Sequence, residues 1–346
     1  MIVDKEFCMS SYLAFRFVVD EDRIFKEGLP HKDHELIPVE KKRPCRTAED
    51  IDRAIRGSLE KIDLSHAGVL LSGGMDSAIL ASYMPKGTKA YTAKCIGENA
   101  IDETIQARKY CDLYDLEHVV VEVSWSDYDK GMEPLMLFQG APIISNEPQA
   151  YKIVKRAKSD GTNLLVHGDT ADIEFGGMSL MLSKDWKYED WIERSIYIRP
   201  ETVLNNPINI YGTYEKYRLP NGLANNQGFI ADIYGRATAG ALTLACQAED
   251  MAFIDPYEEM HLTDPLDLNR IRNGESKYLI RELFHLRYPS LDIPEKLPMS
   301  RPANDWMRNW DGPVRDEFIP ECANKLSGEQ KLLLYSLERF LNLINI

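Results

Sequence analysis

Residues 70–80, LLSGGMDSAIL, decide the expected fold and the expected chemistry of this chain. An apolar run ends at Ser72, two glycines follow, and apolar residues return at helical spacing after Asp76 and Ser77. A Gly-Gly turn lets backbone N–H groups point at an anion, and the start of the next helix favours negative charge. Asp76 would repel a bare phosphate unless a cation such as magnesium lay between them. The stretch therefore predicts a phosphate-binding turn between a strand and a helix; an ordinary turn with a capping serine is the alternative.

Apolar strands alternate with helices along the first half of the chain. The pattern predicts strands at 68–72, 90–96, 118–123 and 163–169 and helices at 77–83, 103–114 and 147–158. Apolar strands separated by helices indicate parallel pairing with helices on both faces of the sheet. We expect an α/β fold with a doubly wound parallel sheet and a helical C-terminal part that begins near residue 230. Ligands of such sheets bind beyond the C-terminal ends of the strands, where SGGMDS and GDTADIEFGG (168–177) both fall.

The chain divides into a short N-terminal part and one large domain. Residues 1–46 contain β-like apolar pieces and a polar linker, and we expect the domain to span 47–346. Thr47, with Asp50 three residues later, predicts the start of its first helix. The segment 178–230, rich in tyrosine, tryptophan and asparagine, is an expected insertion. Its side chains either line the pocket of an acceptor substrate or pack a subdomain.

Composition and charge exclude several classes of protein. The 346 residues carry a net charge of −14, whereas nucleic-acid binders usually present a basic face, so we expect no nucleic-acid partner. The one dense basic run, EKKRPCR at 40–46, is expected to be a solvated linker. No stretch approaches the roughly 20 apolar residues of a membrane span, and the N-terminus does not resemble a signal peptide. The six cysteines are scattered without a CxxC pair, which fits neither a zinc site nor a disulfide framework. We therefore expect a reduced, cytoplasmic protein with no membrane partner.

Several motifs, in matching order, resemble those of a known enzyme family. SGGMDS after a strand is similar to the signature of the PP-loop ATP pyrophosphatases, which cleave ATP between its α and β phosphates. The chain further resembles the synthetase domain of the asparagine synthetases and of the related β-lactam synthetases. The resemblance lies in the segments DETIQAR (102–108), GDTADIEFGG (168–177), AFID (252–255) and GESKYLIRE (274–282). It covers almost the whole chain and implies a PP-loop (adenine nucleotide α-hydrolase-like) fold.

The resemblance implies a site for ATP and Mg²⁺ with three catalytic residues, Asp76, Asp172 and Lys277. Asp76 and Asp172 would share magnesium ions. Lys277 would stabilise negative charge on the α-phosphate or on the tetrahedral intermediate, and the alternative is a solvated lysine at a helix start. The family's contacts with adenine and ribose resemble Val69, Leu70 and the strand 93–95. The ATP- and pyrophosphate-binding residues that the resemblance implies are Leu70, Leu71, Ser72, Gly73, Gly74, Asp76, Ser77, Lys94, Gly168 and Asp169.

The chain departs from the family at the nitrogen-donating and substrate ends. Glutamine-using asparagine synthetases begin Met-Cys with a glutaminase domain, whereas this chain begins Met-Ile, and we expect it to lack that domain. Ile173 follows Asp172 where the family has a second acid, and Glu174 comes one place later. Asp250 or Met251 stands where an arginine is usual. The resemblance therefore does not carry over asparagine as the product. Nitrogen is expected from ammonia, from an amine on the substrate or from a separate glutaminase subunit.

The leading hypothesis is an ATP-dependent ligase that activates a small carboxylate as an acyl-adenylate, releases pyrophosphate and forms an amide with ammonia or an amine. Two alternatives belong to other classes: a PP-loop enzyme of RNA thiolation, and a non-catalytic nucleotide-binding protein. The first expects a basic surface and often paired cysteines, which this sequence lacks. The second expects loss of the charged site residues, because these are costly to keep close together. A homo-oligomer is compatible with the sequence.

Overall fold

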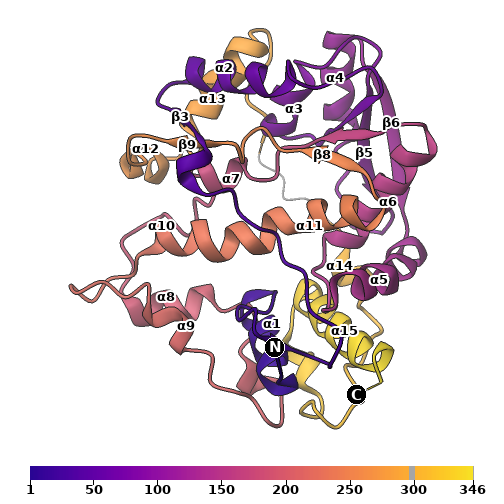
Figure 1. Ribbon diagram of the computed structural model, residues 1–346, viewed down its shortest axis with the longest axis vertical. Coiled ribbons are helices and arrows are strands. Elements are labelled where there is room, and N and C mark those ends of the chain that lie inside the picture. The colour runs from indigo at the N-terminus through magenta and orange to yellow at the C-terminus, as the bar shows by residue number, and fades with distance from the viewer. Residues whose placement is uncertain (296–300, 346) are drawn as a thin grey trace.

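An entirely parallel five-stranded sheet forms the centre of one half of the computed structural model, which describes residues 1–295 and 301–345 (Figure 1). Val69 of the middle strand pairs with Ala90 on one side and with Val166 on the other. The next two strands along the chain lie on one side of it, and the last two lie on its other side. The strand order therefore reverses beside the middle strand. Such a reversal is the point at which doubly wound sheets bind ligands. The spatial order is β6 (Glu117–Val123), β5 (Lys89–Cys95), β4 (Ala67–Leu70), β7 (Leu164–Val166) and β8 (Ala252–Ile254). The predicted doubly wound α/β fold is confirmed.

Helices contribute to two hydrophobic cores, one on each face of this sheet. Val69 and Val166 belong to one core, and Tyr91 and Leu165 belong to the other. Neighbouring strand residues thus alternate between the cores, as the two-residue period of a strand requires. The first core includes α2 (Ala48–Leu59), α3 (Met75–Ala81), α4 (Thr104–Tyr114) and α13 (Tyr278–Arg287). The second includes α1 (Lys5–Phe15), α5 (Trp125–Gln139), α6 (Glu147–Ser159), α11 (Gly235–Ala248) and α15 (Gly328–Leu343).

The first helix of the large domain begins where the sequence predicted. The Thr47 hydroxyl accepts a hydrogen bond from the Asp50 N–H, and the Asp50 carboxylate accepts one from the Thr47 N–H. This reciprocal arrangement is a capping box, which satisfies two backbone donors at the start of α2. Ile51 and Ile55 of the following turns are fully buried. Local capping and the apolar stripe therefore agree on where this helix starts and which face it buries.

The N-terminal segment is helical, so the prediction of β-like structure there is wrong. α1 is capped by Asp4, whose carboxylate accepts a hydrogen bond from the Phe7 N–H. Only two-residue strands flank this helix, β1 (Ile2–Val3) and β2 (Arg23–Ile24). Tyr12 of α1 is fully buried. A short apolar run suits a buried helix as well as a strand, and burial in the core shared with α15 decides between them here.

The basic run at 40–46 is partly folded, which corrects the prediction of a solvated linker. Within it β3 (Arg43–Cys45) pairs in parallel with β9 (Met260–Leu262). The Lys42 ammonium forms an ion pair with Glu174, and its side chain is only 10% exposed. The expectation that a charge run is solvated fails because an acidic residue far along the chain neutralises this lysine.

Residues 178–230 form a mostly irregular lobe around buried aromatic side chains. Trp191 of α8 (Tyr188–Ser195) is fully buried, and its ring centroid lies 4.8 Å from that of Phe229 and 5.5 Å from that of Tyr214. Among the described residues, the lining of the main cavity includes none from this lobe. The aromatic residues of the segment therefore pack a subdomain, which is the second of the two expected alternatives.

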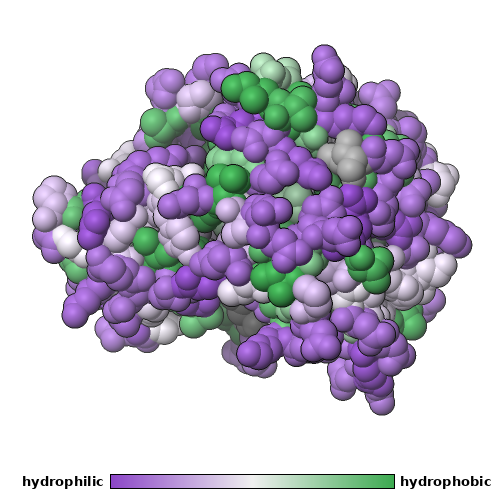
Figure 2. Space-filling model, turned by 90° about the horizontal axis from the view of Figure 1, so that it is seen from below, coloured by the Kyte–Doolittle hydropathy of each residue, from purple (hydrophilic) through white to green (hydrophobic). Residues whose placement is uncertain are grey.

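Short elements connect these parts. They are η1 (Val39–Lys41), α7 (Ala171–Glu174), η2 (Pro200–Thr202), α9 (Gly212–Glu215), α10 (Asn226–Phe229), the π-helical turn η3 (Ile230–Tyr234), α12 (Leu268–Arg272), α14 (Ala303–Trp306) and η4 (Cys322–Lys325). Figure 2 shows hydrophilic side chains over most of one face, with hydrophobic residues scattered between them. Within the part of the chain that the structure describes, no helix combines the length and apolar character needed to cross a bilayer.

Candidate active site

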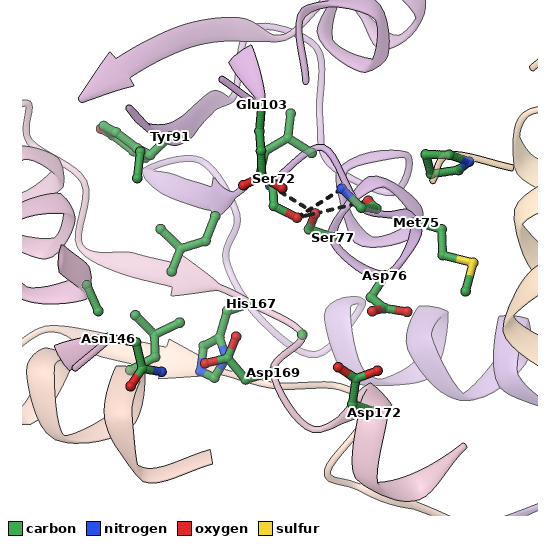
Figure 3. A pocket seen from close by; sticks show the side chains of 18 of the residues that line it. Ser72, Met75, Asp76, Ser77, Tyr91, Glu103, Asn146, His167, Asp169 and Asp172 are labelled. Atoms are coloured by element: carbon green, nitrogen blue, oxygen red, sulfur yellow. Dashed lines mark hydrogen bonds between the residues drawn. The ribbon is translucent and has the colours of Figure 1, made fainter. Parts of the chain in front are cut away.

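A cavity of about 250 Å³ opens beyond the C-terminal ends of β4 and β7, where the strand order reverses (Figure 3). The loops after these two strands form its polar walls, and side chains from α6, α11 and the start of α13 also line it. Because parallel strands end at one edge of the sheet, motifs far apart in the sequence meet there. The predicted site residues that line the cavity are Leu70, Leu71, Ser72, Gly74, Asp76, Ser77, Gly168, Asp169, Asp172 and Lys277.

The SGGMDS loop is held in shape by its own hydroxyl groups. The Ser72 N–H donates to Ser77 Oγ at 3.0 Å, and the Gly74 N–H donates to Ser72 Oγ at 3.1 Å. Gly73 is not among the described cavity-lining residues, and its carbonyl accepts a hydrogen bond from the Tyr110 hydroxyl at 3.1 Å. The loop is therefore preorganised, with its two serines and Gly74 at the cavity wall.

Two carboxylates and one ammonium group meet beside this loop. Asp76 comes from α3, Asp172 from α7, and Lys277 immediately precedes α13. Lys277 Nζ lies 2.7 Å from Asp172 Oδ1 and forms a second ion pair with Asp76. Its side chain is only 3% exposed, so the alternative of a solvated lysine is wrong. Burial lowers the pKa of Lys277, but the two carboxylates outweigh burial and hold the pKa above its ordinary value. The lysine therefore stays charged.

Backbone geometry fixes both sides of these ion pairs. Lys277 has a left-handed backbone conformation with a φ of 55°, which is uncommon for a residue with a side chain. A Cβ at Gly177 would lie 1.8 Å from Asp172 Oδ1, so only glycine leaves room for that carboxylate. Residues held in sparsely populated conformations cluster at functional sites, where the surrounding structure imposes them. The position of Lys277 is thus set by the fold rather than by its own preference.

Asp76 and Asp172 fit a magnesium ion that a nucleotide brings with it. Their oxygens already converge on one cation, the Lys277 ammonium, and carboxylate oxygens are ligands that magnesium prefers. Among residues 1–295 and 301–345, no group of three or more histidine, cysteine, aspartate or glutamate side chains could hold a metal ion. Phosphate oxygens and water would therefore have to complete the coordination, as is usual for magnesium.

Comparison with known proteins settles the family. The family model described as asparagine synthase matches residues 49–244, more than half of the chain. The chain belongs to the asparagine synthase family. None of the curated proteins compared with it matches. Among solved structures, NMN synthetase from Francisella tularensis is similar with 13% sequence identity and a TM-score of 0.27, over 72% of this chain and 97% of that chain. A likeness this weak supports no statement about the reaction.

Membership of the asparagine synthase family makes the chain an ATP-using, adenylate-forming enzyme, and members of the family typically use Mg²⁺. Two family positions nevertheless differ at the substrate end. Glu174, the acid shifted by one place, pairs with Lys42 and does not belong to the described cavity lining. The usual arginine corresponds to Asp250 or Met251. Asp250 is exposed, Met251 is buried, and both also lie outside that lining. The substrate-binding charges of the family are therefore not reproduced at these positions.

Asp169 is a cavity-lining carboxylate with a strongly raised pKa. Burial, followed by the negative charges of Asp172 and Asp76, raises the pKa of Asp169 to about 7. Asp255, the last residue of the AFID motif, accepts hydrogen bonds from the N–H and the hydroxyl of Thr170, both at 2.9 Å. Asp255 thereby fixes the turn that carries Asp169. A carboxyl group that titrates near neutrality is better suited to proton transfer than to phosphate binding.

Lys94 lies outside the described cavity lining, although the sequence grouped it with the ATP-binding residues. Its ammonium is 3.0 Å from an oxygen of Asp102, and its side chain is 38% exposed. Ala93 lines the cavity, so the alternation of β5 turns the next side chain away from it. The residues that no motif marked as part of the site, but that line the cavity, include Asn146, Gln149, Ile153, His167, Ala241 and Leu242. Glu103 and Arg281, which lie in family motifs, line it as well.

Proposed function

We propose that the chain is an ATP-dependent carbon–nitrogen ligase, which activates a carboxylate as an acyl-adenylate and passes the acyl group to ammonia or an amine. The observation that carries the proposal is the meeting of Lys277, Asp76 and Asp172 beside the SGGMDS loop. These groups lie where charge on a transferred phosphoryl group has to be balanced. The family match supports the adenylating half of the reaction. The amide-forming half rests on the chemistry of the cavity.

In the first half-reaction, a carboxylate oxygen of the substrate attacks the α-phosphorus of ATP. The bond from that phosphorus to the oxygen bridging to the β-phosphate breaks, and pyrophosphate leaves with the electron pair. Ser72, Gly74 and Ser77 line the wall that would hold it. Magnesium bound by the two aspartates and by phosphate oxygens would neutralise part of its charge. Lys277 is buried and already positioned, so its positive charge stabilises the transition state without reorganisation.

In the second half-reaction, the nitrogen nucleophile attacks the acyl carbon, and AMP leaves as the carbon–oxygen bond of the mixed anhydride breaks. The attacking nitrogen must lose a proton to become an amide. Asp169 lines the same cavity, and its pKa of about 7 suits a proton acceptor near neutral pH. We therefore assign proton acceptance to Asp169.

The nitrogen donor is proposed to be ammonia, an amine on the substrate, or ammonia delivered by a separate glutaminase subunit. Hydrolysis of glutamine by a cysteine requires a reactive thiolate. Five of the six cysteines are buried, and burial raises the pKa of Cys8 to about 12. The chain by itself is therefore expected to produce no glutamate from glutamine.

The decisive experiment follows both products and the fate of one oxygen. The protein is incubated with magnesium and ATP, a panel of small carboxylates and amines, with and without ammonium, and AMP and pyrophosphate are measured. With an ¹⁸O-labelled carboxylate, one label should appear in AMP, because the attacking oxygen stays on phosphorus when the anhydride opens at its carbon–oxygen bond. Substrate-dependent ADP and phosphate, or AMP without label, would contradict the proposal.

A further inference from the structure

Two buried side chains of the cavity wall have polar atoms without hydrogen-bond partners among the described residues. His167 is 2% exposed and neither of its ring nitrogens is hydrogen-bonded, while Gln149 is 3% exposed and its Oε1 receives no hydrogen bond. An oxygen of Asp255 lies 3.7 Å from His167 Nδ1, which is too far for a hydrogen bond. Buried polar groups are nearly always paired in folded proteins. Unpaired groups on a cavity wall therefore indicate where a ligand supplies the missing partners.

The walls that accompany these two residues are apolar. Figure 3 shows Asn146 and His167 on one side of the cavity and Asp76 and Asp172 on the other. Six aliphatic lining residues come from β4, β5, α6 and α11, and they are Leu70, Ala93, Ala150, Ile153, Ala241 and Leu242. Three of these six are alanines, which leave space between the walls. We call the part of the cavity formed by His167, Gln149 and these aliphatic residues the base end.

The hydrogen-bonding groups of the base end are neutral. Burial lowers the pKa of His167 to about 3, so its ring is uncharged near neutral pH. A neutral imidazole offers one donor and one acceptor, and the amide of Gln149 offers both kinds of group. A phosphate or carboxylate would find no positive partner in either side chain. A flat, neutral heterocycle with donors and acceptors along its edge fits the base end, because its faces are apolar and its edge is polar.

We propose that Gln149 and His167 select the base of ATP by hydrogen bonds to the edge of adenine, with Gln149 Oε1 accepting from the 6-amino group. This inference rests on the proposed function, in which ATP is the nucleotide. The phosphates then extend from the base end toward the SGGMDS loop and Lys277. The family resemblance pointed only to β4 and β5 for adenine, whereas these two side chains come from α6 and from the residue that follows β7.

The test for Gln149 compares ATP with purine riboside 5′-triphosphate, which lacks only the 6-amino group. Dissociation constants are measured by calorimetry with magnesium for the wild type, for Gln149→Met and for Lys152→Ala. We expect the wild type to bind ATP about five-fold more tightly than the analogue, the effect of one net hydrogen bond. Gln149→Met should bind both equally. Lys152→Ala should keep the wild-type ratio, because this lysine of the same helix pairs with Asp127 and lies outside the cavity.

The test for His167 adds inorganic tripolyphosphate, which has no base. His167→Phe is expected to weaken ATP binding by about five-fold and to leave tripolyphosphate binding unchanged. Melting curves show whether each variant folds. If either Gln149→Met or His167→Phe does not fold, the inference is decided by the other of the two.

Three outcomes would overturn the inference: equal affinities of the wild type for ATP and the analogue, an unchanged ratio in folded Gln149→Met, or weaker tripolyphosphate binding in folded His167→Phe. A wild type that bound no nucleotide would refute the proposed function itself, and this inference with it.

Discussion

The two ends of the cavity satisfy their polar groups in opposite ways. At one end, formed by the SGGMDS loop with Lys277, Asp76 and Asp172 and here called the phosphate end, each charged side chain has a partner of opposite charge through a direct ion pair. At the base end, both ring nitrogens of His167 and the Oε1 atom of Gln149 have no hydrogen-bond partner among the described residues. The difference follows from the free-energy cost of burial, because an uncompensated buried charge is far less favourable than an unpaired neutral group. Buried charges must therefore be paired before a ligand arrives, whereas neutral groups can receive their hydrogen-bond partners from the ligand.

Replacing Lys277 should give the largest effect at the phosphate end. Lys277→Ala is expected to lower kcat about 100- to 1,000-fold with little change in ATP affinity, because its charge is needed most in the transition state. Pyrophosphate release and calorimetric ATP binding measure the two quantities. A melting curve must accompany them, since removing one partner of a buried ion pair costs about 3–5 kcal/mol of stability. Near-normal turnover would show that Lys277 is only structural, and a change in affinity alone would show that it binds ground-state phosphate.

Asp169 lines the same cavity, and its titration should be visible in the rate. Its carboxylate form appears as the pH rises through about 7, so kcat/KM should rise with pH and level off above that value. Asp169→Asn removes the proton acceptor and should lower amide formation about 100-fold at pH 8, with loss of the rise. The pH profile of amide formation measures both effects. A wild-type rate that falls between pH 6 and 8 would exclude Asp169 as the base.

Removing the charge of Asp76 should affect binding and turnover together. Asp76→Asn is expected to weaken ATP binding and lower kcat, each about ten-fold, because a charge-assisted contact to magnesium is lost in both ground and transition states. The magnesium concentration for half-maximal activity should rise as well. Titrations of ATP at several magnesium concentrations test this. Unchanged magnesium dependence would mean that Asp76 serves the ion pair with Lys277 and not the metal.

The smallest effect is expected where the sequence prediction and the structure differ. Lys94→Ala should change ATP affinity and turnover by less than about two-fold, because an exposed ion pair such as that with Asp102 contributes little. The same assays measure it, with Lys277→Ala as the contrasting variant. A loss of ten-fold or more would place Lys94 in the phosphate end after all.

The phosphate end could be predicted from the sequence because most of its residues lie within short sequence motifs. SGGMDS and GDTADIEFGG each follow a strand, and parallel strands bring their C-terminal ends to one edge of the sheet. The strand order completes this picture, since β4 and β7 are direct neighbours. Lys277 could be placed only through the family resemblance, because the short connection 273–277 between α12 and α13 and the left-handed backbone of this residue leave no periodic signal.

The base end could not be predicted, because it depends on how separate elements pack. Gln149 lies on a helix whose sequence contains no motif, and only the packing of α6 between β5 and α11 brings it to the cavity. His167 directly precedes the family motif, and its lack of partners is a property of its tertiary surroundings. The same limit applies to α1, because a short apolar run suits a strand as well as a helix and only its packing decides between them. Polar residues beside a known motif deserve more weight than isolated ones.

The ion pairs of Lys277 also bear on how the protein is produced. In proteins with structural metal sites, folding waits for the ion, and chelators unfold them. Here the aspartates suited to magnesium already have a counter-ion that is covalently tethered to the chain. Folding therefore does not depend on the supply of magnesium. A fall in available magnesium would slow the reaction, but the amount of folded enzyme would stay the same.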